Sequence, residues 1–450
     1  MLDRVLYPRS VAVIGASANP AKTGHIILKN IIDAGYKGEI YPINPKGGEI
    51  LGLKVYRSVL EVPGEIDLAV VVVPARVVPS VMEEIGRKGI PGAVIISGGF
   101  GEAGEEGARL EEEVGKIARQ YNVRVIGPNC QGVNNTNIGL CASWPLIKEN
   151  GPMTIVSQSG TVGAAFEGWA AEEGYGISFF VGLGNRLDVD ETDLLSFFVR
   201  DEKTKVVAMY IEGVKRGPEF RRVLEENGGR KPIVILKSGR SPSGARAVQS
   251  HTRSLAGRDE VFTGLFRQYG VVRAETVEEL YDFSKALAFV RPPSGPRVMI
   301  VSSSGGSAII SVDMVEGLGM ELAQLPEWAK EELRARIPPY CIVSNPLDLT
   351  GDADAERYDR VLDVLKDVEG IDTIVTIFGD PIPGAAEVLE KYMDSGKTVI
   401  AVYIGGGEVQ AEEVRKMGKR GIPVFPTPER AIKALKVVMD RASWLKRRYG

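Results

Sequence analysis

The chain has 450 residues, of which 44% are hydrophobic and 25% charged, and its formal net charge is -4. At roughly 100 to 200 residues per domain, this length predicts two to four domains with ordinary hydrophobic cores. The small negative charge argues against nucleic acid or an anionic membrane as the main partner, but it leaves room for local basic patches that bind phosphate-bearing ligands.

The cysteine pattern and the N-terminus limit the class of protein further. Cys130, Cys141 and Cys341 lack CxxC spacing, so neither a zinc site nor a disulfide framework is indicated, and we predict no metal ligands. The N-terminal residues run into a strand-like stretch without the apolar core of a signal peptide, and no apolar stretch reaches about 18 residues. We therefore expect a cytoplasmic protein that does not span a membrane.

The first 130 residues alternate short β-branched runs with amphipathic stretches. The runs predict strands over residues 10–16, 41–44, 66–74, 92–100 and 123–129, and helices are expected between them, as over 81–89 and 107–121. Continuous apolar strands separated by helices are typical of a parallel sheet that is covered on both faces. This pattern predicts a doubly wound α/β domain.

The same alternation restarts twice further along the chain. Residues 132–152 are rich in Gly, Asn and Pro and are interpreted as a linker, after which strands are expected over 153–160, 177–185, 205–213 and 232–239. A second break at 291–297 precedes expected strands over 297–306, 372–380, 397–407 and 422–428. The sequence thus predicts three Rossmann- or flavodoxin-like α/β domains, at residues 1–130, 131–290 and 296–450. The turns TIVSQSGTVG and MIVSSSGGSA resemble each other, which weakly supports a repeated plan in the second and third domains.

The end of the first expected strand suits an anion. Gly15 allows a tight turn that presents backbone N–H groups at the start of a helix. The dinucleotide fingerprint GxGxxG is absent, and Lys22-Thr23 follows alanine where a P-loop needs glycine. The second strand ends in Asn44 and Lys46 and lacks the acidic residue that holds a ribose diol, which favours a phosphate-bearing ligand other than NAD.

Two more strand ends are expected at the same carboxyl edge, where open α/β sheets bind ligands. They carry Val73-Pro74 and Ser97-Gly98. Taken singly, each of these residues is equally well an ordinary turn residue. His25, at the start of the first helical stretch, is interpreted as structural or solvent-facing.

His251 is one of two histidines and lies in VQSHTRSLAG, a stretch interpreted as a loop of small residues. A neutral imidazole is a competent nucleophile near pH 7, and a loop would let it carry a group from one place to another, which suggests a phosphoryl carrier. The alternative is an ordinary solvated histidine.

Two features of the second domain support the carrier hypothesis. Ser159, Gly160 and Thr161 are expected to open a helix, where N–H groups and hydroxyls converge on a phosphate, although a simple helix cap would look the same. Glu212 ends an apolar strand, so its carboxylate could fix the tautomer of His251. A surface ion pair with a neighbouring basic residue is the alternative for Glu212.

These motifs, in order, resemble the α subunit of the ADP-forming acetyl-CoA synthetases, relatives of succinyl-CoA synthetase. The resemblance extends over almost the whole chain and rests on SVAVIGAS, YPINPK, VVVPA, IISGGF, IGPNCQG, IVSQSGTVGAA, GNRLDVDE, YIEG, LKSGRSPSGARA, SHTRSLAG and NPLDLTGDA. It implies a CoA-binding domain, a domain with a phosphorylated histidine and a third flavodoxin-like domain.

The resemblance also implies roles for residues. His251 would be the phosphohistidine, Glu212 its partner, and the turn at Ser159-Gly160 the cradle of its phosphate. The residues implied to contact CoA or an acyl-CoA are Gly15, Ala16, Ser17, Asn44, Lys46, Val73, Pro74, Ser97 and Gly98. No segment is interpreted as an ATP-grasp domain, so the resemblance implies a separate ATP-grasp β subunit in an α2β2 heterotetramer that brings ADP or ATP with Mg2+.

One position departs from the family pattern, and two other functions stay open. Arg253 stands where the family usually has glycine, and an arginine there would either clamp the phosphate or stiffen the loop. A CoA- or acyl-CoA-binding regulatory protein without turnover would bind CoA and never trap phosphate. A nicotinamide-dependent dehydrogenase is disfavoured by the missing GxGxxG.

Overall fold

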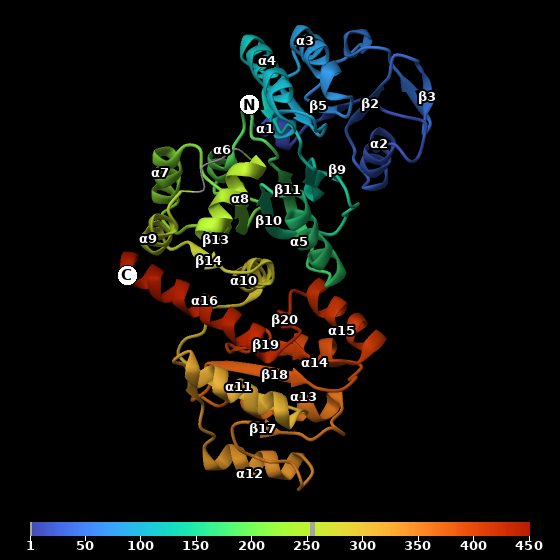
Figure 1. Cartoon of the computed structure of the whole chain (residues 1–450). Coiled ribbons are helices and arrows are strands. Elements are labelled where there is room, and N and C mark those ends of the chain that lie inside the picture. The colour runs from blue at the N-terminus through green and yellow to red at the C-terminus, as the bar shows by residue number, and fades with distance from the viewer. Residues whose placement is uncertain (1, 253–256) are drawn as a thin grey trace. The chain divides into compact units, whose positions relative to one another are not determined.

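The structure is a computed structural model that describes residues 2–252 and 257–450 (Figure 1). The chain forms two compact units. The first contains residues 1–171 and 176–277, and the second contains residues 172–175 and 278–450. No helix in the described part of the chain is long and apolar enough to span a membrane.

The first sheet of the first unit is parallel, with strand order β2-β1-β5-β6-β7. Because β1 has β2 on one side and β5 on the other, the strand order reverses at β1, and open sheets bind ligands at such a switch point. The strands are β1 (Ser10–Ile14), β2 (Glu39–Ile43), β5 (Leu68–Val71), β6 (Gly92–Ile95) and β7 (Arg124–Ile126), with a hairpin of β3 (Gly48–Ile50) and β4 (Leu53–Val55) beside them. The helices are α1 (Leu2–Leu6), α2 (Thr23–Asp33), α3 (Val78–Lys88) and α4 (Glu105–Tyr121).

Both faces of this sheet are buried. In β1, Val11 and Val13 belong to one hydrophobic cluster, and Ala12 and Ile14 belong to another. Residues of α1 and α2 complete the first cluster, and residues of α3 and α4 complete the second. Successive side chains of a strand point to opposite faces, so burial of both faces requires the continuous apolar runs seen in the sequence.

The second sheet, in the same unit, has the order β14-β13-β12-β10-β11-β8-β9. Its strands are β8 (Val133–Asn135), β9 (Leu140–Ala142), β10 (Asn150–Ser157), β11 (Ile177–Gly182), β12 (Val206–Ile211), β13 (Ile233–Lys237) and β14 (Val272–Ala274). Its helices are α5 (Gly160–Glu172), α6 (Glu191–Phe198), α7 (Gly217–Asn227), α8 (Pro242–Thr252) and α9 (Asp259–Tyr269). The interpretation of residues 132–152 as a linker is wrong, because β8 and β9 form an antiparallel extension of this sheet. The polar Asn residues of β8 find partners inside the protein: Asn135, for example, donates to the carbonyl oxygen of Leu6 at 2.7 Å.

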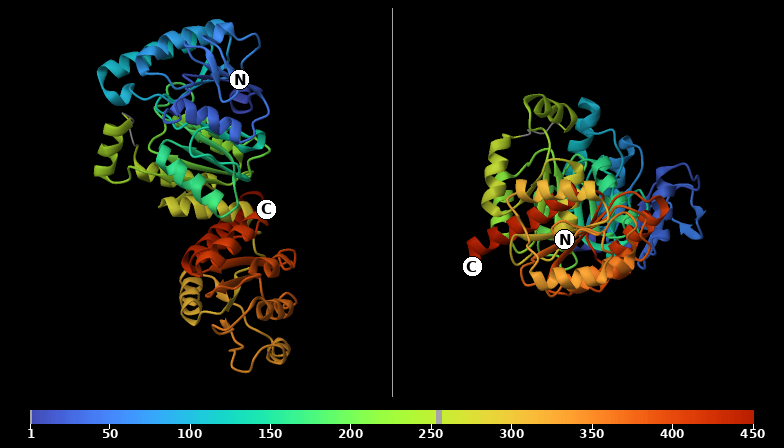
Figure 2. Two further views of the ribbon diagram at one scale, coloured as in Figure 1. Left: turned by 90° about the vertical axis from the view of Figure 1, so that its right-hand side faces the viewer. Right: turned by 90° about the horizontal axis from the view of Figure 1, so that it is seen from below.

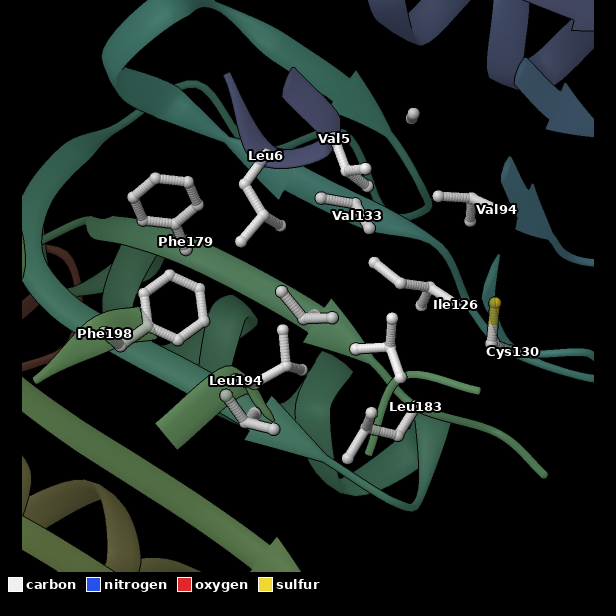
Figure 3. Packing of buried hydrophobic residues seen from close by; sticks show 14 of the residues in the cluster. Val5, Leu6, Val94, Ile126, Cys130, Val133, Phe179, Leu183, Leu194 and Phe198 are labelled. Carbon is white, nitrogen blue, oxygen red and sulfur yellow. The ribbon is translucent and has the colours of Figure 1, made fainter. Parts of the chain in front are cut away.

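One hydrophobic cluster joins the two sheets of this unit (Figure 3). Val94 and Ile126 come from the first sheet, and Phe179 and Leu183 come from β11 and the turn after it. The remaining labelled side chains in Figure 3 are Val5, Leu6, Cys130, Val133, Leu194 and Phe198. The two sheets therefore share a core, and their carboxyl edges are held in a fixed relation. This unit ends at Val277, whereas the sequence places the boundary near residue 290.

The second unit contains the third sheet, with strand order β16-β15-β18-β19-β20 and with β17 paired to β15. Its strands pair in parallel throughout the described residues. Its strands are β15 (Arg297–Ser302), β16 (Glu321–Leu322), β17 (Leu347–Asp348), β18 (Thr373–Phe378), β19 (Thr398–Tyr403) and β20 (Val424–Phe425). Its helices are α10 (Val277–Phe289), α11 (Gly305–Gly317), α12 (Glu327–Arg336), α13 (Ala355–Leu365), α14 (Ala385–Glu390), α15 (Gly407–Lys419) and α16 (Pro428–Tyr449). Helices α11 and α16 pack together, while α12 to α15 contact one another in sequence, so this sheet also lies between helices (Figures 1 and 2).

The second and third sheets share a turn at the start of a helix. After β10, the hydroxyl of Ser157 donates to the carbonyl oxygen of Ser159 at 2.5 Å and accepts from its N–H at 3.2 Å. After β15, Ser302 and Ser304 make the same pair of bonds, at 2.8 and 2.9 Å. The similarity of TIVSQSGTVG and MIVSSSGGSA is therefore a similarity of structure.

Candidate active site

The carboxyl edge of the first sheet brings together the four predicted turns. Gly15 to Ser17 follow β1, Asn44 and Lys46 follow β2, Val73-Pro74 follow β5, and Ser97-Gly98 follow β6. The amide of Asn44 donates to the carbonyl oxygen of Ala16 at 2.8 Å, and the hydroxyl of Ser97 donates to that of Val73 at 2.5 Å. One bond links the turns after β2 and β1, and the other links the turns after β6 and β5, so a linked pair of turns lies on each side of the switch point.

Two glycines allow the first turn to form. Gly15 has φ of +96°, and a Cβ atom there would lie 2.7 Å from the carbonyl oxygen of Val72. A Cβ atom on Gly24, in α2, would lie 2.0 Å from the carbonyl oxygen of Gly15. Helix α2 therefore begins against the turn itself, and only glycine permits this approach. His25 is buried next to it, with its Nδ1 atom 2.8 Å from the carbonyl oxygen of Ser17, as expected of a structural histidine.

A carboxylate holds the loop after β6. Glu102 accepts hydrogen bonds from the N–H groups of Gly99 at 2.6 Å and Phe100 at 3.1 Å. Its second oxygen accepts from the side chain of Asn185 at 2.6 Å. Burial raises the pKa of Glu102, but the bonds from Asn185 and the Gly99 amide outweigh it, and its pKa lies below the usual range. The loop after Ser97-Gly98 is thus tied to the segment after β11.

At the carboxyl edge of the second sheet, a Ser/Gly/Thr turn opens helix α5. Ser159 precedes α5, and Gly160 and Thr161 form its first turn, as predicted. The hydroxyls of Ser159 and Thr161 are 3.1 Å apart, and Thr161 is exposed. Free N–H groups at the start of a helix and nearby hydroxyls attract phosphate. A Cβ atom on Gly160 would lie 2.9 Å from the side-chain oxygen of the buried Gln131, so a larger residue at this turn would have to displace Gln131.

Glu212 lies one strand away from this turn. It follows β12, which pairs with β10 so that Ser157 is opposite Tyr210, and it is buried with 4% exposure. The two neighbouring basic residues are engaged elsewhere: Arg216 binds Asp190 through two hydrogen bonds of 2.6 and 2.7 Å, and the ammonium of Lys215 donates to the carbonyl oxygens of Asn185 and Arg186.

The backbone at His251 is helical. Residues 242–252 form α8, which corrects the interpretation of this stretch as a loop of small residues, at least as far as Thr252. The side chain of His251 and the whole of Arg253 lie outside the described residues. Helix α8 lies next to the turn at Gly101–Ala103, which continues the loop after β6. The chain segment with His251 therefore approaches the edge of the first sheet.

The sequence analysis missed several charged and polar residues at the carboxyl edge of the second sheet. Gln158, Arg186 and Glu191 form a buried network with the backbone after Glu212, and Lys237 ends β13 with 1% exposure. Burial lowers the pKa of Lys237 and, together with the Arg186 charge, that of Lys215. The motifs GNRLDVDE and LKSGRS contain most of these residues. Because these motifs lie where β11 and β13 end, they could have been chosen from the sequence as candidate site segments.

Cys130 lies near the two edges, but it is not a nucleophile in this structure. Its thiol is buried and donates to the carbonyl oxygen of Ile95 at 3.3 Å. Burial raises its pKa to about 12, so it is a neutral thiol near pH 7. The arrangement therefore places helix starts at two sheet edges in one unit with a buried carboxylate, and such groups suit phosphate-dependent chemistry on a phosphate-bearing ligand.

Comparisons with known proteins agree with this arrangement. Three family models match the chain: a CoA binding domain over residues 9–136, a succinyl-CoA ligase like flavodoxin domain over 150–287, and a Ligase-CoA domain over 298–435. The chain is 44% identical to the α subunit of acetate–CoA ligase [ADP-forming] I from Pyrococcus furiosus, with 98% of each chain covered.

Relatives of the same family include longer chains and a solved structure. The chain is 38% identical to 4-hydroxybutyrate–CoA ligase [ADP-forming] from Nitrosopumilus maritimus, matching 98% of its own length and 64% of that protein. It is similar, with a TM-score of 0.89 and 36% identity, to a dinucleotide-forming acetyl-coenzyme A synthetase 1 from Ca. Korarchaeum cryptofilum in complex with phosphate and ADP. That match covers 100% of this chain and 99% of the other. The chain belongs to the family of α subunits of ADP-forming acetyl-CoA synthetases, and it is the α subunit of an ADP-forming acyl-CoA ligase.

Proposed function

We propose that this chain catalyses acyl-CoA + phosphate + ADP ⇌ carboxylic acid + CoA + ATP through an acyl phosphate and a phosphorylated His251. One observation supports it best. A single compact unit contains the carboxyl edge of the first sheet, the turn at Ser159–Thr161 and the buried Glu212.

The edge of the first sheet would hold CoA. The turns at Gly15–Ser17, Asn44 and Lys46, Val73-Pro74, and Ser97-Gly98 lie side by side there. The start of α2 packs against the turn at Gly15, and Lys46 is exposed, so the helix start and the Lys46 ammonium can both meet phosphate groups of CoA. The thioester would then lie towards the loop after β6 and α8.

The reaction would proceed in three displacements. A phosphate oxygen attacks the thioester carbon, the C–S bond breaks, and CoA leaves as the thiolate with an acyl phosphate as product. A ring nitrogen of His251 attacks phosphorus, the P–O bond to the acyl group breaks, and the carboxylate leaves. Finally an oxygen of the ADP β-phosphate attacks phosphorus, the P–N bond breaks, and ATP forms.

Two groups of this chain would assist the second step. The Glu212 carboxylate would accept a hydrogen bond from the N–H of the other ring nitrogen, fix the tautomer and stabilise the charge that develops on the ring. The N–H groups at the start of α5, with Ser159 and Thr161, would bind the phosphate oxygens during transfer.

The nucleotide would bind to a partner. Relatives of similar length are named α subunits, whereas relatives in which this chain covers only 62% to 64% of the length carry no subunit designation in their names. We propose a separate ATP-grasp β subunit that carries ADP with Mg2+, in an α2β2 assembly. The acid is a separate question, because relatives at 34% to 44% identity are named for acetate, 4-hydroxybutyrate and trans-ferulate.

The test is the complete reaction. The chain is co-expressed with its candidate β subunit, and ATP formation is measured with ADP, phosphate, Mg2+ and a panel of acyl-CoAs. We expect turnover that requires phosphate and is lost in His251→Ala. CoA binding without turnover on any acyl-CoA would favour a regulatory protein that binds CoA or acyl-CoA.

A further inference from the structure

We propose that Gln158, Arg186 and Glu191 are positioning residues: together they fix the backbone that presents the Glu212 carboxylate. The inference deepens the proposed function, on which it rests for the role of Glu212. None of the three side chains is expected to touch the phosphate or the acyl group.

The side-chain amide of Gln158 is the centre of this network. Its oxygen accepts from the N–H of Glu212 at 2.7 Å, and its nitrogen donates to the carbonyl oxygen of Gly213 at 2.9 Å. The side chain of Gln158 thus bonds to the backbone of two consecutive residues, to the N–H of Glu212 and to the carbonyl oxygen of Gly213. Gln158 directly follows β10 and is 5% exposed, so it ties the end of β12 to the turn that opens α5.

A buried ion pair holds the Gln158 amide and the same backbone from the other side. Arg186 and Glu191 are bonded at 2.9 Å, and their side chains are 1% and 0% exposed. Glu191 also accepts from the nitrogen of Gln158 at 3.1 Å, and Arg186 also donates to the carbonyl oxygen of Gly213 at 3.0 Å. Gly213 therefore receives two donors, and both belong to the network.

The network also reaches Lys215, two residues after Gly213. The second oxygen of Glu191 accepts from the backbone N–H of Lys215 at 2.8 Å. The backbone groups of residues 212, 213 and 215 are thus all bonded to the network, and this fixes a segment that belongs to neither a helix nor a strand. A segment held in this way limits the positions that the Glu212 side chain can take.

The position of Arg186 supports a specific role. Arg186 adopts φ of +59°, a left-handed conformation that is unfavourable for a long side chain. Burying a charged pair in this conformation is a costly way to stabilise a fold, since well-packed apolar residues often serve as well. The geometry is accounted for if the pair serves to orient polar backbone groups, which apolar side chains cannot do.

The first experiment needs no activity. Hydrogen exchange at the Glu212 amide is measured in the full chain for the wild type, for Gln158→Met and for the control Thr154→Val. Thr154 is buried in the same strand as the residues before Gln158 and bonds to Thr204 at 2.8 Å, and Thr204 keeps its bond to Asp201 in the control. We expect exchange at least about 10-fold faster in Gln158→Met and unchanged in the control. Equal exchange in all three proteins overturns the proposal.

The second experiment uses the complete enzyme with its β subunit. The rate of His251 phosphorylation and the Kd for CoA are measured for Gln158→Met, Glu212→Gln and the double variant. We expect Gln158→Met to slow phosphorylation by on the order of 10- to 100-fold with an unchanged Kd for CoA. In the Glu212→Gln background it should slow the rate less than about 2-fold further, because both changes affect one carboxylate.

The outcomes separate the two proposals. A full additional loss in the double variant would show that Gln158 acts independently of Glu212, and it would overturn the positioning role. A wild-type enzyme that never phosphorylates His251 would refute the proposed function, while the exchange experiment would still decide whether the network fixes Glu212.

Discussion

Breaking the buried ion pair should destabilise the first unit far more than breaking an exposed pair. Arg186→Met keeps much of the side-chain volume but leaves Glu191 charged and without its guanidinium, at 0% exposure. Removing one partner of a buried pair costs about 3–5 kcal/mol. Because Glu191 keeps bonds from Gln158 and the Lys215 N–H, we expect a loss near the lower end, about 3 kcal/mol. For a unit of more than 250 residues, that loss should lower the midpoint of thermal unfolding by roughly 5–6 °C.

Thermal and urea unfolding of the full chain test this prediction. The matched control is Arg200→Met, which breaks a 3.5 Å pair with Glu226 whose side chains are 71% and 52% exposed and which should cost less than about 1 kcal/mol. The double variant Arg186→Met/Glu191→Met removes both charges and should regain part of the stability, because the Gln158 amide and the Lys215 N–H then lose Glu191 as their acceptor. The reasoning is refuted if Arg186→Met costs no more than the control, or if the double variant is as unstable as the single one.

Three more perturbations test other parts of the structure. Gly24→Ala should abolish CoA binding as measured by calorimetry, because its Cβ atom would lie 2.0 Å from the carbonyl oxygen of Gly15; wild-type affinity would show that α2 does not pack on the turn. Asn185→Leu should weaken CoA binding at least about 3-fold by releasing Glu102 and the loop after β6, and an unchanged Kd would contradict this link. Glu167 is fully buried, and burial raises its pKa well above 4.5. The contribution of the neutral Glu167 to the free energy of unfolding is therefore complete below about pH 4.5, and it is lost as the pH rises towards the folded-state pKa. Glu167→Gln should therefore gain stability relative to the wild type between about pH 5 and pH 8 in urea unfolding, and a constant difference would mean that Glu167 is not buried as a neutral acid.

The positions of the strands, and of the turns at the two sheet edges that carry the candidate site, could be predicted from the sequence because each depends on local patterns. A run such as residues 10–14 must be a strand with both faces buried, and the turn after such a strand must lie at the carboxyl edge of the sheet. Gly15, Asn44 and Ser97 are therefore brought to one edge by topology alone. The same reasoning placed Ser159 and Glu212 at the ends of the adjacent strands β10 and β12.

The errors of the sequence analysis have physical causes. Residues 132–152 have the composition of a linker, but the side chains of Asn134 and Asn135 donate to Glu167 and to the carbonyl oxygen of Leu6, and these long-range partners are invisible in the sequence. The stretch before Thr252 contains Ser and Gly, yet its amphipathic spacing forms α8.

The buried network of Gln158, Arg186 and Glu191 was missed for a different reason. Arg186 and Glu191 are five residues apart and resemble an exposed charge pattern, whereas their burial depends on Gly213 and Gln158, which are distant in the chain. The sequence carries the residue types of this network but not their partners.

The most direct test of the central claim is the identification of a phosphohistidine. The complete enzyme is incubated with acyl-CoAs, phosphate and Mg2+ without ADP, and the chain is analysed by intact mass and by peptide mapping at neutral pH, with His251→Ala as the control. The account predicts one acid-labile phosphate on the peptide that contains His251, and none in the control. A wild-type enzyme that turns over and never carries phosphate on this peptide would contradict the account.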